Sequence, residues 1–76
     1  MARRKPDIDN HRKALPKKTH SAMEAMRRQR AVAGAPSAFY MTQDVYWETL
    51  WALSRSGFDV ARGFVFGGVP VKPYAS

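Results

Sequence analysis

The segment that decides the fold is RGFVFGGVPVK, residues 62–72, in which two apolar stretches flank a pair of glycines. Both central positions of a type I′ turn need positive φ, which glycine adopts without strain. The segment therefore predicts a β-hairpin over about 63–72 that turns at Gly67 and Gly68. Pro70 is tolerated in this hairpin provided that its strand lies at an edge. The expected register pairs Phe66 with Val69, Val65 with Pro70 and Phe64 with Val71.

Before the hairpin, the sequence predicts an amphipathic helix over about 43–55. Thr42 suits the N-cap, Asp44 the first turn, and Gly57 the left-handed position that follows the last turn. Large apolar side chains recur in this segment at spacings of three and four. We expect the apolar face of the hairpin to pack across Tyr46, Trp47, Leu50 and Trp51.

A second helix with a thinner apolar side is expected over about 21–33. Ser21 and Glu24 have the spacing of a capping box, and Gly34 followed by Pro36 is a stop signal. Most of the stability of such a helix comes from packing against another element. We therefore expect it to lie on the rest of the fold or on a partner.

Charged and aromatic residues divide the chain into two parts. Residues 1–33 hold ten Lys or Arg and three Asp or Glu, which accounts for the formal net charge of +7, whereas residues 34–76 are neutral and contain all nine aromatic residues. Residues 7–15 include only Ile8 and Leu15 as large apolar side chains, too few to offset the entropy of ordering the segment. The sequence thus predicts an extended basic arm over about 1–20 and a small module over 21–76. The expected fold class is α+β, with two helices and a C-terminal hairpin.

The residue types exclude several kinds of site. The chain has no cysteine, so neither a disulfide nor a thiolate zinc site can form. The segment DIDNH, residues 7–11, lacks the glycine and the distal glutamate of a calcium loop, and neither His11 nor His20 has a catalytic partner on a rigid element. No stretch approaches the roughly 18 apolar residues of a membrane span. We expect no enzymatic activity, no metal, no cofactor, no small-molecule substrate and no membrane partner.

The predicted module is too small to be stable on its own apolar side chains, and the open edges of a hairpin invite strand addition by another chain. We therefore expect a partner. Trp47 and Trp51 could stack on bases as in single-strand binders, but their spacing favours the core, or one ring in the core and one at an interface. A helix-turn-helix over residues 50–62 would carry only Arg62 as a basic side chain in its second helix, too little to read a major groove.

The segment FGGVPV, residues 66–71, together with the helix before it, resembles short polypeptides of tailed bacteriophages in which a helix leads into a hairpin rich in phenylalanine and glycine. The resemblance covers the last third of the chain, and the Gly-Gly pair departs from the single glycine expected there. It implies a minor virion or assembly component that clips onto larger capsid or connector subunits.

These patterns favour a non-enzymatic accessory structural protein, a capsid, cement or connector-type component of a virion that assembles in the host cytoplasm. An aromatic knob and the basic arm would dock on larger subunits, in one copy or several. The alternative is a small cytoplasmic protein that binds DNA or RNA through its basic side chains. The residues expected to bind the partner are Arg3, Arg4, Lys5, Arg12, Lys13, Lys17, Lys18, Arg27, Arg28, Arg30, Trp47, Trp51, Phe64 and Phe66.

Overall fold

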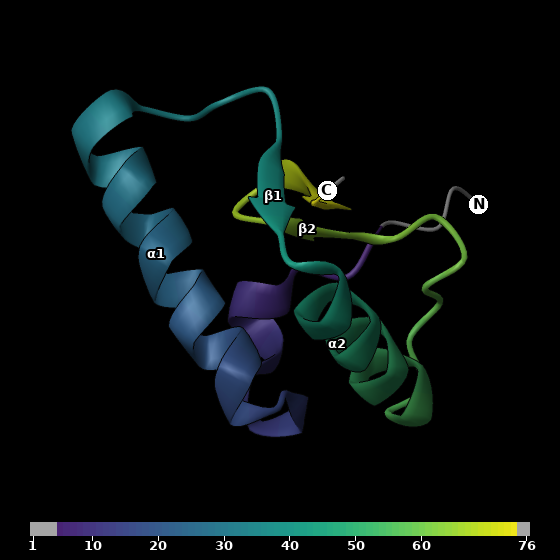
Figure 1. Cartoon of the computed structure of the whole chain (residues 1–76). Coiled ribbons are helices and arrows are strands. Elements are labelled where there is room, and N and C mark those ends of the chain that lie inside the picture. The colour runs from purple at the N-terminus through teal and green to yellow at the C-terminus, as the bar shows by residue number, and fades with distance from the viewer. Residues whose placement is uncertain (1–4, 75–76) are drawn as a thin grey trace.

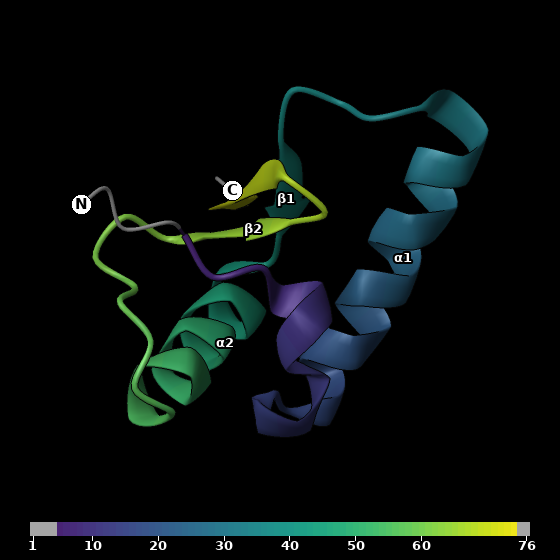
Figure 2. The ribbon, with the colours of Figure 1, turned by 180° about the vertical axis from the view of Figure 1, so that it is seen from behind.

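A computed structural model describes residues 5–74 of the chain. Three helices and a small sheet pack together, and the α+β fold class is confirmed. In Figures 1 and 2, the 3-10 helix η1 lies between α1 and α2, below the sheet. The strand order is β1-β3-β2, with β1 parallel and β2 antiparallel to β3. The elements are η1 (Ile8–Ala14), α1 (Lys17–Ala33), β1 (Phe39–Met41), α2 (Gln43–Arg55), β2 (Phe64–Phe66) and β3 (Val69–Pro73).

The hairpin of β2 and β3 has the predicted register, with Phe66 opposite Val69. Gly67 and Gly68 have φ angles of 55° and 84°, as a type I′ turn requires. The condition set for Pro70, that its strand lies at an edge, is not met, because β3 is the central strand. Pro70 is tolerated there because β1 begins to pair only at the next residue, opposite Val71.

The chain covers both edges of its own hairpin. On one side β1 pairs with β3. On the other side the Val65 N–H donates to the Pro6 carbonyl at 3.0 Å, and Asp7 forms a parallel bridge with Val65. An isolated hairpin was expected to have two edges open to strand addition. In the structure neither edge of this hairpin is open.

The extended arm predicted for residues 1–20 is corrected by the structure over the part that it describes. Asp7 caps η1, because its Oδ1 atom accepts a hydrogen bond from the Asp9 N–H at 3.1 Å. Ile8 is 0% exposed and Leu15 is also buried. These two side chains suffice to order the segment because they enter a core that β2, α1 and α2 already enclose. Arg3 and Arg4 lie outside the described residues.

Helix α1 begins one turn earlier than predicted, directly after Pro16. A buried contact with α2 explains the difference: the hydroxyl groups of Thr19 and Thr49 are hydrogen-bonded and both residues are fully buried. The Thr49 hydroxyl donates its single proton to the Val45 carbonyl at 2.7 Å, so Thr19 is the donor to Thr49. The capping-box residue Ser21 consequently lies inside the helix.

Helix α2 has the predicted bounds, and it ends in the predicted Schellman motif. Gly57 has a φ of 91°, and the Phe58 N–H donates to the Leu53 carbonyl at 3.1 Å. The prediction that Trp47 and Trp51 pack under the hairpin is wrong, since they are 52% and 66% exposed. The core is filled without them, because β1 and η1 add Phe39, Met41 and Ile8 to the side chains of the hairpin.

Candidate functional site

Four exposed aromatic side chains form one candidate surface, which we call the aromatic strip: Tyr40, Trp47, Trp51 and Tyr74. Trp47 and Trp51 lie one turn apart on α2, each about 160° around the helix axis from Thr49. Because Thr49 contacts α1, both indole rings face away from that helix. The rings of Tyr40 and Tyr74 pack edge to face, with centroids 6.5 Å apart.

Gln43 connects the two halves of the aromatic strip. Its Nε2 atom donates a hydrogen bond to the Tyr74 carbonyl at 3.3 Å, and Gln43 precedes Trp47 by one turn of α2. The Tyr74 N–H in turn donates to the Met41 carbonyl at 2.6 Å, which fixes this residue at the end of β1. Gln43 therefore links the end of the sheet that carries Tyr74 to the helix that carries both tryptophans.

Two exposed carboxylates border the aromatic strip on α2. Asp44 lies three residues before Trp47, and Glu48 lies three residues before Trp51, so each carboxylate is adjacent to a ring on the helix surface. Hydrogen bonds from the Thr42 hydroxyl and the Val45 backbone hold the pKa of Asp44 below its ordinary value. The strip thus combines large rings with negative charge, which disfavours phosphate groups at this surface.

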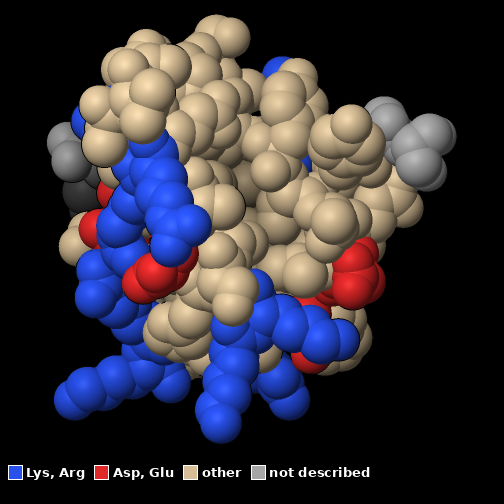
Figure 3. Space-filling view, turned by 60° about the vertical axis from the view of Figure 1, so that its left-hand side comes forward, with Lys and Arg blue, Asp and Glu red and all other residues tan. Residues whose placement is uncertain are grey.

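A second candidate surface is formed by the exposed and half-buried Lys and Arg residues of η1 and α1, which we call the basic face. Figure 3 shows these side chains gathered along one side and the lower end of the face that α1 presents. Residues 5–33 contain eight Lys or Arg against three Asp or Glu. The residues of the basic face are Arg12, Lys13, Lys17, Lys18, Arg27, Arg28 and Arg30.

Asp9 holds two of these basic residues in place. Its Oδ1 atom forms ion pairs with Arg27 and with Arg12, the latter at 3.1 Å. The hydrogen bond from Arg27 is the main reason why the pKa of Asp9 lies below its ordinary value. The Arg27 guanidinium carbon also lies 5.7 Å from the centre of the Phe66 ring. Arg27 therefore attaches η1 and the hairpin to α1, in addition to contributing charge.

The turn of the hairpin is attached to both helices of the N-terminal half. Arg30 donates from Nη1 to the Gly67 carbonyl at 3.2 Å, and the Gly67 N–H donates to Asp7 Oδ1 at 3.2 Å. These contacts explain why a segment without an apolar run is ordered against the sheet.

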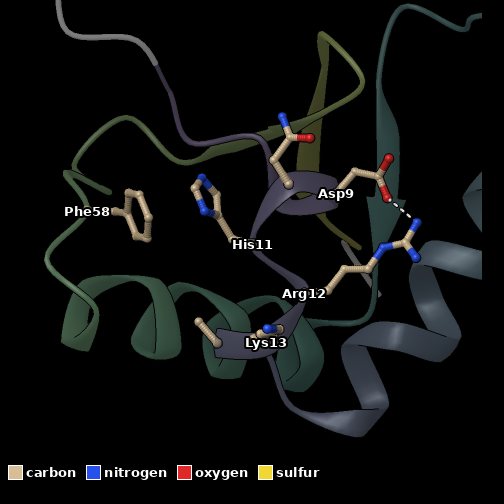
Figure 4. Close-up of a pocket in the computed structure, with 7 residues that line it drawn as sticks. Asp9, His11, Arg12, Lys13 and Phe58 are labelled. Atoms are coloured by element: carbon tan, nitrogen blue, oxygen red, sulfur yellow. Dashed lines mark hydrogen bonds and ion pairs between the residues drawn. The ribbon is translucent and has the colours of Figure 1, made fainter.

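An open hollow beside η1 is lined by residues 9–14 and Phe58. Figure 4 shows the His11 ring facing Phe58, whereas the Asp9 carboxylate points to Arg12 on the other side of η1. The centroids of the His11 and Phe58 rings are 4.0 Å apart. Asp9 consequently does not orient His11 as the carboxylate of a catalytic pair would. The contact between the His11 and Phe58 rings packs η1 against the segment that follows α2.

The structure separates the residues predicted to bind a partner. Phe64 and Phe66 are 1% and 3% exposed, because they form the centre of the core, so we remove them from the candidate interface. Trp47 and Trp51 lie in the aromatic strip. Their neighbours Tyr40 and Tyr74 were missed, because β1 has only three residues and no turn signal that would predict its pairing with β3. Lys5 is exposed, and the other described basic residues that were predicted to bind the partner are those of the basic face.

Within residues 5–74, no group of three His, Asp or Glu side chains is arranged to hold a metal ion. No helix in that part of the chain has the length and apolar character needed to cross a membrane. Comparison of the chain with protein-family models, curated proteins and solved structures gives no match. The resemblance to short bacteriophage polypeptides therefore stays a prediction.

Proposed function

We propose that this chain is a non-enzymatic accessory structural protein that docks on a larger protein assembly through the aromatic strip. The observation that carries the proposal is the exposure of both tryptophans of α2 in a protein whose core is otherwise filled with apolar side chains. Because both indole rings are more than half exposed to water, the folded chain forgoes a large part of the free energy of burying them, which is about 1.5–3 kcal/mol for a fully buried large apolar side chain. That free energy becomes available when a partner covers them.

The composition of the aromatic strip favours a protein as the partner. Tyrosine and tryptophan are enriched at the centres of protein interfaces, where they contribute a large share of the binding energy. Asp44 and Glu48 lie beside Trp47 and Trp51, so the matching surface should carry an apolar groove bordered by Lys or Arg. The same carboxylates repel the phosphates of a nucleic acid, which makes base stacking on these rings unfavourable.

The resemblance of the helix and hairpin to bacteriophage polypeptides gives the proposal its more specific form. In that form the larger assembly is a virion, formed in the host cytoplasm, and the chain is a minor capsid, cement or connector-type component. The small size of the protein and its two distinct surfaces suit a component that joins subunits.

The experiment is to produce the tagged chain together with the products of its neighbouring genes and to sediment the extract through a gradient. The wild-type chain should travel with the large assembly. The double variant Trp47→Ser and Trp51→Ser should stay at the top of the gradient while its circular dichroism spectrum remains that of the folded protein, because both rings are exposed.

The matched control is Val32→Ser, which removes another exposed large apolar side chain outside the aromatic strip. It should sediment as the wild type does. If the double variant still travels with the assembly, the aromatic strip is not the docking surface. If the purified wild-type chain forms stable dimers that the double variant does not form, the strip joins two copies of the chain and the proposal is wrong.

A further inference from the structure

The basic face is distinct from the aromatic strip and fits a different kind of ligand. We infer that it binds the phosphate backbone of a double-stranded nucleic acid and does not read the bases. This inference goes beyond the proposed function and does not depend on it, because the residues involved lie on η1 and α1 and not on the outer side of α2.

The basic face lacks the features of a protein interface. Among the described residues, the exposed large apolar side chains are Val32 and the four rings of the aromatic strip, and only Val32 belongs to η1 or α1. Stable protein interfaces have an apolar or aromatic centre and a polar rim. The basic face has the charge of a rim without such a centre. A polyanion is the ligand that binds such a surface by charge alone.

Several cations of the basic face are available to a ligand. Both ion pairs found between described residues go to Asp9, and they engage Arg12 and Arg27. Lys13, Lys17 and Arg28 are exposed and form no ion pair with a carboxylate of the described chain. Each contact of such a cation with a phosphate releases a condensed counterion, which is favourable at low salt.

The arrangement of the cations along α1 favours a duplex over a single strand. The helix has 17 residues and is about 25 Å long, with basic residues near both ends. Duplex DNA presents about one negative charge per 1.7 Å of its axis, so a helix of this length faces a continuous row of phosphates. Single strands are bound mainly by stacking on aromatic rings, and η1 and α1 contain no aromatic residue other than histidine. Phosphate contacts carry no sequence information, so no sequence preference is expected.

The test uses the full chain and short fluorescently labelled nucleic acids, with anisotropy measured over a series of salt concentrations. Duplex DNA and duplex RNA form two arms that distinguish the source of the phosphates, and single-stranded DNA and polyglutamate form two more. The variant Lys13→Gln, Lys17→Gln and Arg28→Gln should reduce the slope of log K against log salt by about 2–3, and weaken duplex binding at least about 100-fold at ~0.1 M salt.

The matched control is Arg55→Gln, Arg62→Gln and Lys72→Gln, which removes the same formal charge from three exposed residues outside the basic face. Its slope should change by less than about one. The strip variant Trp47→Ser and Trp51→Ser should bind the duplex as the wild type does, so that failure of the proposed function and failure of this inference are distinguished.

Four results would overturn the inference. The first is absence of duplex binding at low salt, and the second is equal weakening by the two triple variants, which would show an effect of net charge alone. The third is tighter binding of single-stranded DNA than of duplex, since that result requires stacking. The fourth is tighter binding of polyglutamate than of duplex, which would make an acidic protein surface the better ligand.

Discussion

Replacing Ile8 by alanine tests whether the N-terminal segment belongs to the core. Ile8 is 0% exposed and lies in η1, which contacts both β2 and α2. The substitution removes three buried carbon atoms, worth about 2.4 kcal/mol at roughly 0.8 each, and the cavity that remains adds to this. The expected loss is about 3 kcal/mol in the free energy of unfolding.

A loss of this size is a large part of the total stability of so small a protein. Domains have about 0.05–0.15 kcal/mol of stability per residue, which gives this chain roughly 4–11 kcal/mol. Each kcal/mol shifts the melting temperature of a domain of this size by about 4–8 °C, so Ile8→Ala should melt about 12–24 °C below the wild type. The measurement is circular dichroism during thermal and urea denaturation.

Val32→Ala is the matched control, because Val32 is a β-branched residue that is 89% exposed. It should change the melting temperature by no more than about 4 °C, since surface substitutions are usually within 0.5 kcal/mol. If Ile8→Ala melts with the wild type, residues 8–14 are not part of the core. The N-terminal segment would then be the solvated arm that its composition predicts.

Three further predictions concern single contacts and use the same denaturation measurements. Asp9→Asn should lower the free energy of unfolding at pH 7 by less than about 1 kcal/mol, since the ion pair with Arg27 is partly exposed. The pKa of Asp9 is depressed in the folded chain, so the ion pair stabilises the fold at pH values above the ordinary carboxyl pKa of about 3.9. The difference in stability between variant and wild type should vanish as acid protonates Asp9. A difference that persists in strong acid would contradict this assignment. Thr49→Val should lower the free energy of unfolding by about 1–3 kcal/mol, because it leaves the buried Thr19 donor without its acceptor. Thr19→Val combined with Thr49→Val should lower it by less than the sum of the two single changes. Additive losses would show that the two hydroxyls do not interact. Gly68→Ala should cost about 1–2 kcal/mol because alanine is strained at a φ of 84°, and an unchanged stability would rule out the type I′ turn.

The parts of the fold that the sequence predicts are those determined by local signals. The Gly67-Gly68 pair determines the turn and hence the register of β2 and β3. Thr42 and Gly57 mark the two ends of α2, and Gly34 marks the end of α1. At each of these positions a backbone conformation or a cap depends on one or two residues, so the pattern alone is informative.

The N-terminal segment and β1 depend on contacts between residues far apart in the chain. Ile8 becomes buried only because β2 lies beside η1, and Phe39 pairs with a residue of β3 near the other end of the chain. A stretch with few apolar residues is therefore ordered by a core that other segments supply. Composition treats the same stretch as solvated, because it counts only the apolar residues within it.

The candidate site was predicted in part. The sequence pattern of α2 shows that the helix carries several aromatic side chains. Which of these side chains are buried depends on β1 and η1, because these two elements fill the core. For this reason the candidate interface contains the exposed Tyr40 and Tyr74 instead of the predicted Phe64 and Phe66, which are buried. Lys17 and Arg28 could be assigned to one surface only after α1 was known to begin at Lys17, because in a helix with this start they lie about 20° apart around the axis.

The position of β3 has a consequence for synthesis of the protein. This strand lies in the centre of the sheet, yet the ribosome makes it after η1, α1, α2 and the two strands that pair with it. Until β3 has emerged, β1 has no strand to pair with, and β2 can pair only with the segment at Pro6 and Asp7. Completion of the sheet is thus delayed until β3 has been synthesised, and during that interval its apolar strands are exposed to chaperones and to other nascent chains.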